Sequence, residues 1–157
     1  MKARKIIGKL LLGFVLISIG FAIGKEVGRR QTPSGSEADI TGVAPGQNIV
    51  IVYYMHTTFR CVTCNLVESM GKELVDTEYA EALKADRLEW RAVNYQDNEQ
   101  LAARYKVGGN MIVVVKFENG QEVASKRLIR VMELANKRDE YMLYVRQGVD
   151  EILGGSR

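Results

Sequence analysis

The chain has 157 residues, which is enough for one domain of ordinary size together with an anchor and a linker. Its hydrophobic and charged shares, 46% and 26%, are those of a globular protein. The net charge of +3 is too small to indicate nucleic-acid binding, and much of the positive charge flanks an apolar N-terminal segment. We therefore expect no nucleic acid among the partners of this chain.

The first predicted element is a membrane-spanning helix over residues 6–24. A helix needs about 20 apolar residues to cross a bilayer. Only Lys9 interrupts this stretch, close to its start, where a lysine side chain can extend to the lipid headgroups. The uninterrupted part, residues 10–23, has the length of the core of a cleaved signal peptide, which is the alternative. We predict an uncleaved signal anchor over residues 1–30, in contact with the bilayer through residues 6–24.

Positive charges on both sides of this segment bear on its orientation. On the N-terminal side, every charged residue is basic, namely Lys2, Arg4, Lys5 and Lys9. On the C-terminal side, the acidic residue Glu26 offsets part of the positive charge. Loops on the cytoplasmic side of a membrane are enriched in lysine and arginine. We therefore predict a single-pass protein of the cytoplasmic membrane, with its soluble domain outside the cytoplasm, where disulfide chemistry is common.

A linker and then a folded domain follow. Residues 31–47 are rich in glycine, proline and serine and offer little to bury, so we predict a flexible linker there and a domain over residues 48–157. The domain begins with a continuous β-branched and aromatic run, Asn48–Tyr54, which is typical of a strand buried on both faces.

A polar loop, residues 56–60, precedes a long helix over residues 61–84. Its spacing places four apolar residues on one face, and a bend is expected near Asp76. These residues are Leu66, Met70, Leu74 and Val75. An alternating second strand is predicted over residues 88–95, and Asp97 can cap a short helix that ends at Tyr105.

The rest of the domain contains a hairpin and a final helix. Two glycines and Asn110 break the chain before an apolar strand over residues 111–117. Asn119 and Gly120 are a two-residue hairpin signal, which predicts an antiparallel return strand over residues 121–127. Helical residues continue to Leu153. The predicted order, β-α-β-α-β-β-α, gives an α/β fold with a mixed sheet between helical layers, a three-layer sandwich.

The two cysteines of the chain, Cys61 and Cys64, lie at the predicted start of the long helix. The thiolate is the nucleophile in disulfide exchange, and the unpaired N–H groups at a helix N-terminus favour an anion. We therefore predict a lowered pKa for Cys61 and assign it as the attacking thiol. Cys64, one turn further along the same face, is close enough to resolve a mixed disulfide.

Two neighbouring residues are predicted to support this site. Arg60 adds positive charge directly before Cys61, and His56 is the only histidine of the chain, five residues before Cys61. A histidine at this place can transfer protons or stabilise the thiolate.

Other functions of the cysteine pair remain open. Zinc or copper would accept both thiolates, with His56 as a third ligand. A closed zinc site needs four ligands, however, and the sequence has no second cysteine or histidine pair. A further alternative is a non-catalytic subunit of a redox complex. We expect neither a metal nor another cofactor, and the sequence has no flavin-binding motif.

The region from Asn48 to Leu153 resembles the thioredoxin superfamily. Within it, an aromatic strand, a histidine, an Arg-Cys-x-x-Cys motif and a later Leu-Glu-Trp resemble a group of small thioredoxin-like proteins labelled as the nitrophenyl compound nitroreductase subunit family. The matching residues are His56, Arg60, Cys61, Cys64 and Trp90. The resemblance implies a thioredoxin-like fold and electron transfer with a protein dithiol or disulfide partner. A nitroreductase reaction by this chain alone is not expected.

The chain departs from ordinary thioredoxins at two places. Thioredoxins carry a cis-proline at the start of the third strand, but this chain has no proline after Pro45. The partner-facing loop is therefore predicted to consist of Gly109, Asn110 and Met111 with Gly108. The buried acid of the first strand is also absent, because residues 52–55 are uncharged. These departures favour a narrow range of partners.

Overall fold

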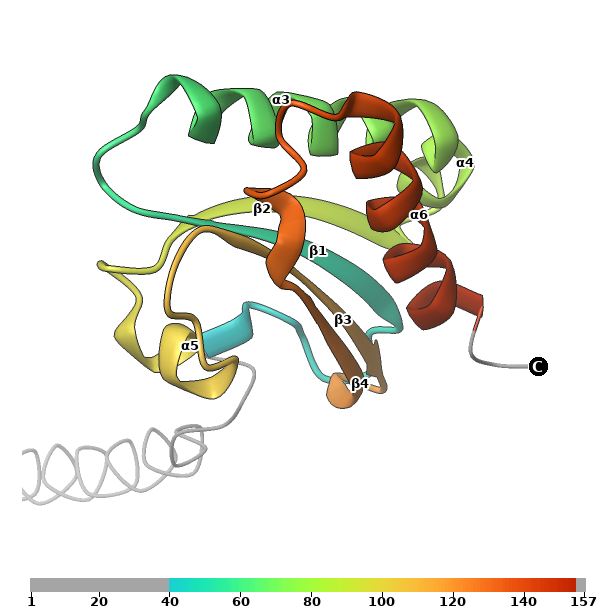
Figure 1. The fold of residues 1–157 in the computed structure, drawn as a ribbon. Helices are drawn as coiled ribbons and strands as arrows, with labels where there is room; N and C mark the ends of the chain where they lie inside the picture. The colour runs from blue at the N-terminus through green and yellow to red at the C-terminus, as the bar shows by residue number, and fades with distance from the viewer. Residues whose placement is uncertain (1–39, 155–157) are drawn as a thin grey trace, which may run out of the picture. The chain divides into compact units, whose positions relative to one another are not determined.

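A four-stranded mixed sheet forms the centre of the domain (Figure 1). The computed structural model describes residues 40–154. The strands are β1 (Ile49–His56), β2 (Leu88–Asn94), β3 (Met111–Glu118) and β4 (Gln121–Leu128), in the spatial order β2-β1-β3-β4. Only β1 and β2 are parallel, whereas β3 runs antiparallel to both β1 and β4. The four predicted strands are confirmed, with ends that differ by one or two residues.

Helices cover both faces of the sheet, so the predicted three layers are present. The helices α3 (Val62–Glu78), α4 (Ala80–Lys84) and α6 (Arg138–Gly154) pack on one face, and α5 (Glu99–Arg104) lies on the other (Figure 1). A short 3-10 helix, η1 (Ile129–Val131), follows β4. Each face of the sheet buries its own hydrophobic cluster.

The continuous apolar run of β1 follows from this two-sided burial. Val52 and Tyr54 face the cluster under α3 and α6, which we call the first cluster, while Tyr53 and Met55 face the second cluster near α5. Successive side chains of a strand point to opposite faces, so a strand buried on both faces needs apolar residues at every position.

The predicted hairpin between β3 and β4 is confirmed. Glu118 pairs with Gln121, which leaves Asn119 and Gly120 as the two turn residues. Their φ angles are 55° and 78°, the positive values that a type I′ turn requires at both central positions. Local chemistry therefore determines this turn.

The described part of the predicted linker (residues 31–47), residues 40–47, packs against the domain. Val43 is buried in the second cluster, at 1% exposure. The carbonyl of Thr41 accepts hydrogen bonds from the Tyr53 hydroxyl and from Nη1 of Arg91, at 3.2 and 2.5 Å. The backbone N–H of Gly120 donates to the carbonyl of Gln47 at 2.8 Å. Residues 41–47 therefore contact the rest of the domain through long-range contacts that composition does not reveal.

Three helix details differ from the sequence prediction. The long helix breaks at Tyr79, three residues after the predicted bend, and Leu66 is exposed because the buried face runs through Cys64, Val67, Met70, Gly71, Leu74 and Val75. Asn98, not Asp97, precedes α5, and the Asp97 carboxylate accepts a hydrogen bond from Asn94 instead. The C-terminal region is not one helix, since turns separate η1 from α6.

The predicted membrane span, residues 6–24, lies outside the described residues. Between residues 40 and 154, no helix combines the length and the apolar character that crossing a membrane requires.

Candidate functional site

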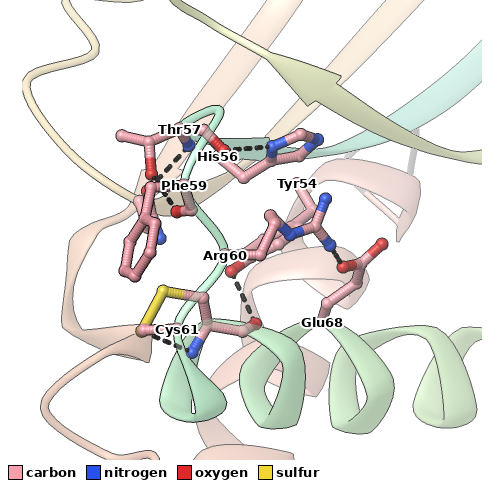
Figure 2. Close-up of a disulfide and its surroundings, with 9 residues drawn as sticks. Tyr54, His56, Thr57, Phe59, Arg60, Cys61 and Glu68 are labelled. Carbon is pink, nitrogen blue, oxygen red and sulfur yellow. Dashed lines mark hydrogen bonds and ion pairs between the residues drawn. A yellow bond between two sulfur atoms is a disulfide. The ribbon is translucent and has the colours of Figure 1, made fainter.

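Cys61 and Cys64 form a disulfide at the N-terminus of α3 (Figure 2). Their Cα atoms are 5.0 Å apart. Cys61 is the N-cap residue of the helix, and its sulfur accepts a hydrogen bond from the backbone N–H of Cys64 at 3.1 Å. Cys64 is buried, at 5% exposure, whereas Cys61 is half-buried. An accessible first sulfur and a buried second one agree with the roles predicted for attack and resolution, although the roles themselves remain predictions.

The helix end at this disulfide favours an anion. The N-cap sulfur lies among backbone N–H groups that lack helical partners, at the positive end of the helix dipole. The first turn of α3 contains no acidic residue that would oppose this field. A thiolate formed at Cys61 on reduction would therefore be stabilised by the backbone, independently of any nearby side chain.

Arg60 does not present a free positive charge to Cys61. Its guanidinium forms an ion pair with the carboxylate of Glu68 on α3 and lies 6.0 Å above the centre of the Tyr54 ring. The sequence analysis missed Glu68. Its position four residues after Cys64, on the same side of the helix, was the available signal.

His56 lies apart from the disulfide. Its Nδ1 donates to the carbonyl of Thr57 at 2.9 Å, and Figure 2 shows its ring directed away from Cys61. Within residues 40–154, no hydrogen bond or ion pair joins this ring to either cysteine. In the disulfide form, no direct contact between His56 and the cysteines supports the role predicted for His56, which stays a prediction.

Side chains from two other loops hold the segment before Cys61. The Thr57 N–H donates to Oδ1 of Asn110 at 3.2 Å, and the Thr58 N–H donates to Oε1 of Gln96 at 2.9 Å. The predicted partner-facing loop is therefore connected to the cysteine loop through Asn110. The side chain of Met111 is buried in the second cluster, while Gly109 is half-exposed. The partner-facing role of this loop stays a prediction.

Tyr54 is the polar group directly under Cys64. Its side chain is fully buried, and its hydroxyl donates to the carbonyl of Cys64 at 2.8 Å. Its ring stacks on Trp90, with centroids 6.3 Å apart. Burial raises the pKa of Tyr54 above its ordinary value, so the hydroxyl remains a donor at neutral pH. The sequence placed Tyr54 in a buried strand and indicated no role for it at the site.

Among residues 40–154, no third metal ligand lies beside the cysteines. In the part of the chain that the structure describes, no group of three histidine, cysteine, aspartate or glutamate side chains is placed to hold a metal ion. His56, the third ligand in the zinc or copper alternative, points elsewhere (Figure 2).

Large apolar side chains are exposed beside the disulfide. Phe59 is 81% exposed and Val62, between the two cysteines, is 87% exposed. Leu66, one turn further along α3, is also exposed. Exposed apolar groups that gather at one place mark contact surfaces.

No protein-family model and no curated protein matches the chain. Solved structures that it resembles include three thioredoxins. The thioredoxin of Malassezia sympodialis is 19% identical, with 69% of this chain and 88% of that chain covered and a TM-score of 0.42. The germline-specific thioredoxin Deadhead of Drosophila melanogaster is 23% identical, with 60% of this chain and 83% of that chain covered and a TM-score of 0.38. Oxidized mitochondrial thioredoxin 3 of Saccharomyces cerevisiae is 15% identical, with 60% of this chain and 81% of that chain covered and a TM-score of 0.38. At these similarities, only the chain's own residues support an assignment of function.

Proposed function

We propose that this chain is a thiol–disulfide oxidoreductase that exchanges electrons with a protein partner. The observation that supports this most is the Cys61–Cys64 disulfide at the start of α3, with the Cys61 sulfur at the N-cap. A helix N-terminus stabilises the thiolate that exchange requires, and the second cysteine is within bonding distance to complete it.

The exchange needs two displacements at sulfur. The thiolate of reduced Cys61 attacks a disulfide of the partner, which forms a mixed disulfide and releases one partner thiolate. Cys64, after losing its proton to solvent, attacks the Cys61 sulfur, closes the Cys61–Cys64 disulfide and releases the second partner thiolate. The chain loses two electrons and the partner gains them. The reverse sequence oxidises a partner dithiol.

The exposed side chains of Phe59 and Val62 support a protein as the partner. Both lie beside the reacting sulfurs, so a partner must cover them while its own sulfur reaches Cys61. Burying them removes apolar surface from water and favours partners with apolar residues near the exchanging sulfur. This surface, with the loop at Asn110, would select a narrow range of partners.

The sequence supplies the remaining parts of the proposal. Residues 6–24 anchor the chain in the cytoplasmic membrane, and the lysines and arginines around them favour an extracytoplasmic domain. The resemblance to the nitroreductase subunit group is compatible with electron delivery to a partner that carries out a reduction. Metal binding is not proposed, because the residues that the structure describes, 40–154, add no ligand to the two sulfurs.

Trapping of a mixed disulfide tests this function. A Cys64→Ser variant retains the attacking thiol and lacks the resolving one, so it should accumulate a thiol-reversible adduct with a membrane or extracytoplasmic protein through Cys61. The matched control, Cys61→Ser combined with Cys64→Ser, should form none. Absence of any adduct together with an ordinary Cys61 thiol pKa would refute the proposal, and zinc or copper retained by the reduced wild type would favour the metal alternative.

Replacing Val62 with serine should weaken partner binding without changing the redox chemistry. Truncation of an apolar contact at an interface costs on the order of 1 kcal/mol, about a fivefold rise in KM for the trapped partner. Exchange with dithiothreitol, which buries no such surface, should be unchanged. Val123→Ser, at another exposed valine on β4, serves as the control and should leave KM unchanged. Equal KM values for the two variants would contradict the contact surface.

A further inference from the structure

The positive charge of Arg60, which was expected to activate the Cys61 sulfur, is neutralised by an ion pair with Glu68. Its guanidinium contacts Glu68, and Figure 2 shows it directed toward that carboxylate and away from the Cys61 sulfur. The side chains of Arg60 and Glu68 are 30% and 24% exposed, so water only partly screens the pair. Glu68 therefore offsets, in the disulfide form, the one cation that is adjacent to Cys61 in the chain.

Arg60 also retains an unused hydrogen-bond donor. Its Nε is buried and, among residues 40–154, has no hydrogen-bond partner. A buried donor without a partner is unfavourable, because it has lost its hydrogen bond to water. The disulfide is neutral and a weak acceptor, but reduction creates an anionic sulfur on the adjacent residue. The guanidinium then has two possible anionic partners, one carboxylate and one thiolate.

We propose that Glu68 and the Cys61 thiolate compete for Arg60, so that Glu68 is a positioning residue that opposes reduction of the disulfide. This inference rests on the proposed function. In the exchange, a partner dithiol and the Cys61–Cys64 disulfide give a partner disulfide, the Cys61 thiolate, the Cys64 thiol and one released proton. Glu68 raises the free energy of the thiolate product, because Arg60 must leave or share the carboxylate to reach it.

The other groups around Cys61 leave this competition as the main local charge effect. Strand β1 contributes the phenol of Tyr54 and the ring of His56, which is bonded to Thr57. In the loop before β3, Gly108, Gly109 and Asn110 are uncharged, and Lys106 is the one charged residue. The first turn of α3 has no acidic residue, so Glu68 is the first carboxylate along this helix.

Substitution of Glu68 by glutamine tests the proposal in the full-length chain. The variant keeps the side-chain shape and removes the charge, so Arg60 is released toward the thiolate. The acid dissociation constant of the Cys61 thiol, followed by thiolate absorbance after chemical reduction, should rise about threefold, a modest value for a partly screened pair. At a pH above the wild-type thiol pKa, the equilibrium with glutathione should move about threefold toward the dithiol, or about 14 mV.

Glu73→Gln is the matched control. Glu73 lies on the same helix and pairs with Arg138 at 2.6 Å, away from the cysteines, so its removal changes the net charge by the same amount. We expect no change in either readout. Thermal unfolding of both oxidised variants shows whether folding is affected.

The two proposals fail in different ways. If Glu68→Gln and Glu73→Gln give the same Cys61 pKa and the same potential, the competition is disproved, whether or not the wild type exchanges with a partner. The Arg60→Gln background tests whether Glu68 acts on Cys61 through Arg60. In that background Glu68→Gln should change the Cys61 pKa clearly less than in the wild type. An equal change would show that the charge of Glu68 acts on the thiolate directly, and would overturn the role of Arg60. Failure of the trapping experiment concerns the proposed function alone.

Discussion

Replacing Tyr54 with phenylalanine is expected to destabilise the domain by about 1.5 kcal/mol. The hydroxyl is fully buried and donates to the Cys64 carbonyl at 2.8 Å, so the variant loses a buried hydrogen bond and keeps the ring that packs on Trp90. The Cys64 carbonyl remains within α3 in the variant, so the loss of stability is limited to that of one hydrogen bond. Urea unfolding of the oxidised chain measures the change.

Tyr144→Phe is the control for this substitution. Tyr144 is half-exposed on α6, and its ring contact with Arg130 does not need the hydroxyl. The free energy of unfolding of the Tyr144→Phe variant should differ from that of the wild type by less than about 0.5 kcal/mol. The Tyr54 variant should also resolve mixed disulfides more slowly, because the turn that carries Cys64 has lost its attachment to β1. A Tyr54 variant as stable as the Tyr144 variant would show that the hydroxyl does not anchor α3.

The sequence was sufficient for features that local chemistry determines. The turn at Asn119 and Gly120 follows from the backbone angles that these residues tolerate. The two-sided burial of β1 follows from its unbroken apolar run. The placement of Cys61 at a helix start follows from the change from a polar loop to helical spacing. None of these inferences needs a contact between distant parts of the chain.

Long-range packing explains what the sequence did not reveal. Nothing local distinguishes Val43 from a linker residue, because its burial depends on the sheet that forms after it. Local spacing also did not indicate that β3 runs antiparallel to β1. At the site, Arg60 was assigned to its sequence neighbour Cys61, but a long side chain can reach a carboxylate two helical turns away, as it does at Glu68.

A valine at Gly71 should cause the largest loss of stability, about 3 kcal/mol. Gly71 lies on the buried face of α3, where a Cβ would lie 2.7 Å from Cη2 of Trp90 and 2.8 Å from the hydroxyl of Tyr141. Neither ring can move freely. Trp90 stacks on Tyr54, and the fully buried Tyr141 donates to the carbonyl of Val67 at 2.7 Å.

Two further variants separate crowding from backbone preference. Gly154→Val, on α6 where a Cβ would meet nothing within 4 Å, should be nearly neutral in urea unfolding. Gly71→Ala gains about 1 kcal/mol of helix propensity and lacks the two γ methyl groups of valine, although its Cβ meets both rings. Its loss of stability should therefore be smaller than that of valine. If Gly71→Val unfolds at the same urea concentration as Gly154→Val, α3 does not pack as closely as described. Because displaced Trp90 would press on Tyr54, the Gly71 variants should also alter the reduction potential of the disulfide, which links packing under α3 to the chemistry at its N-terminus.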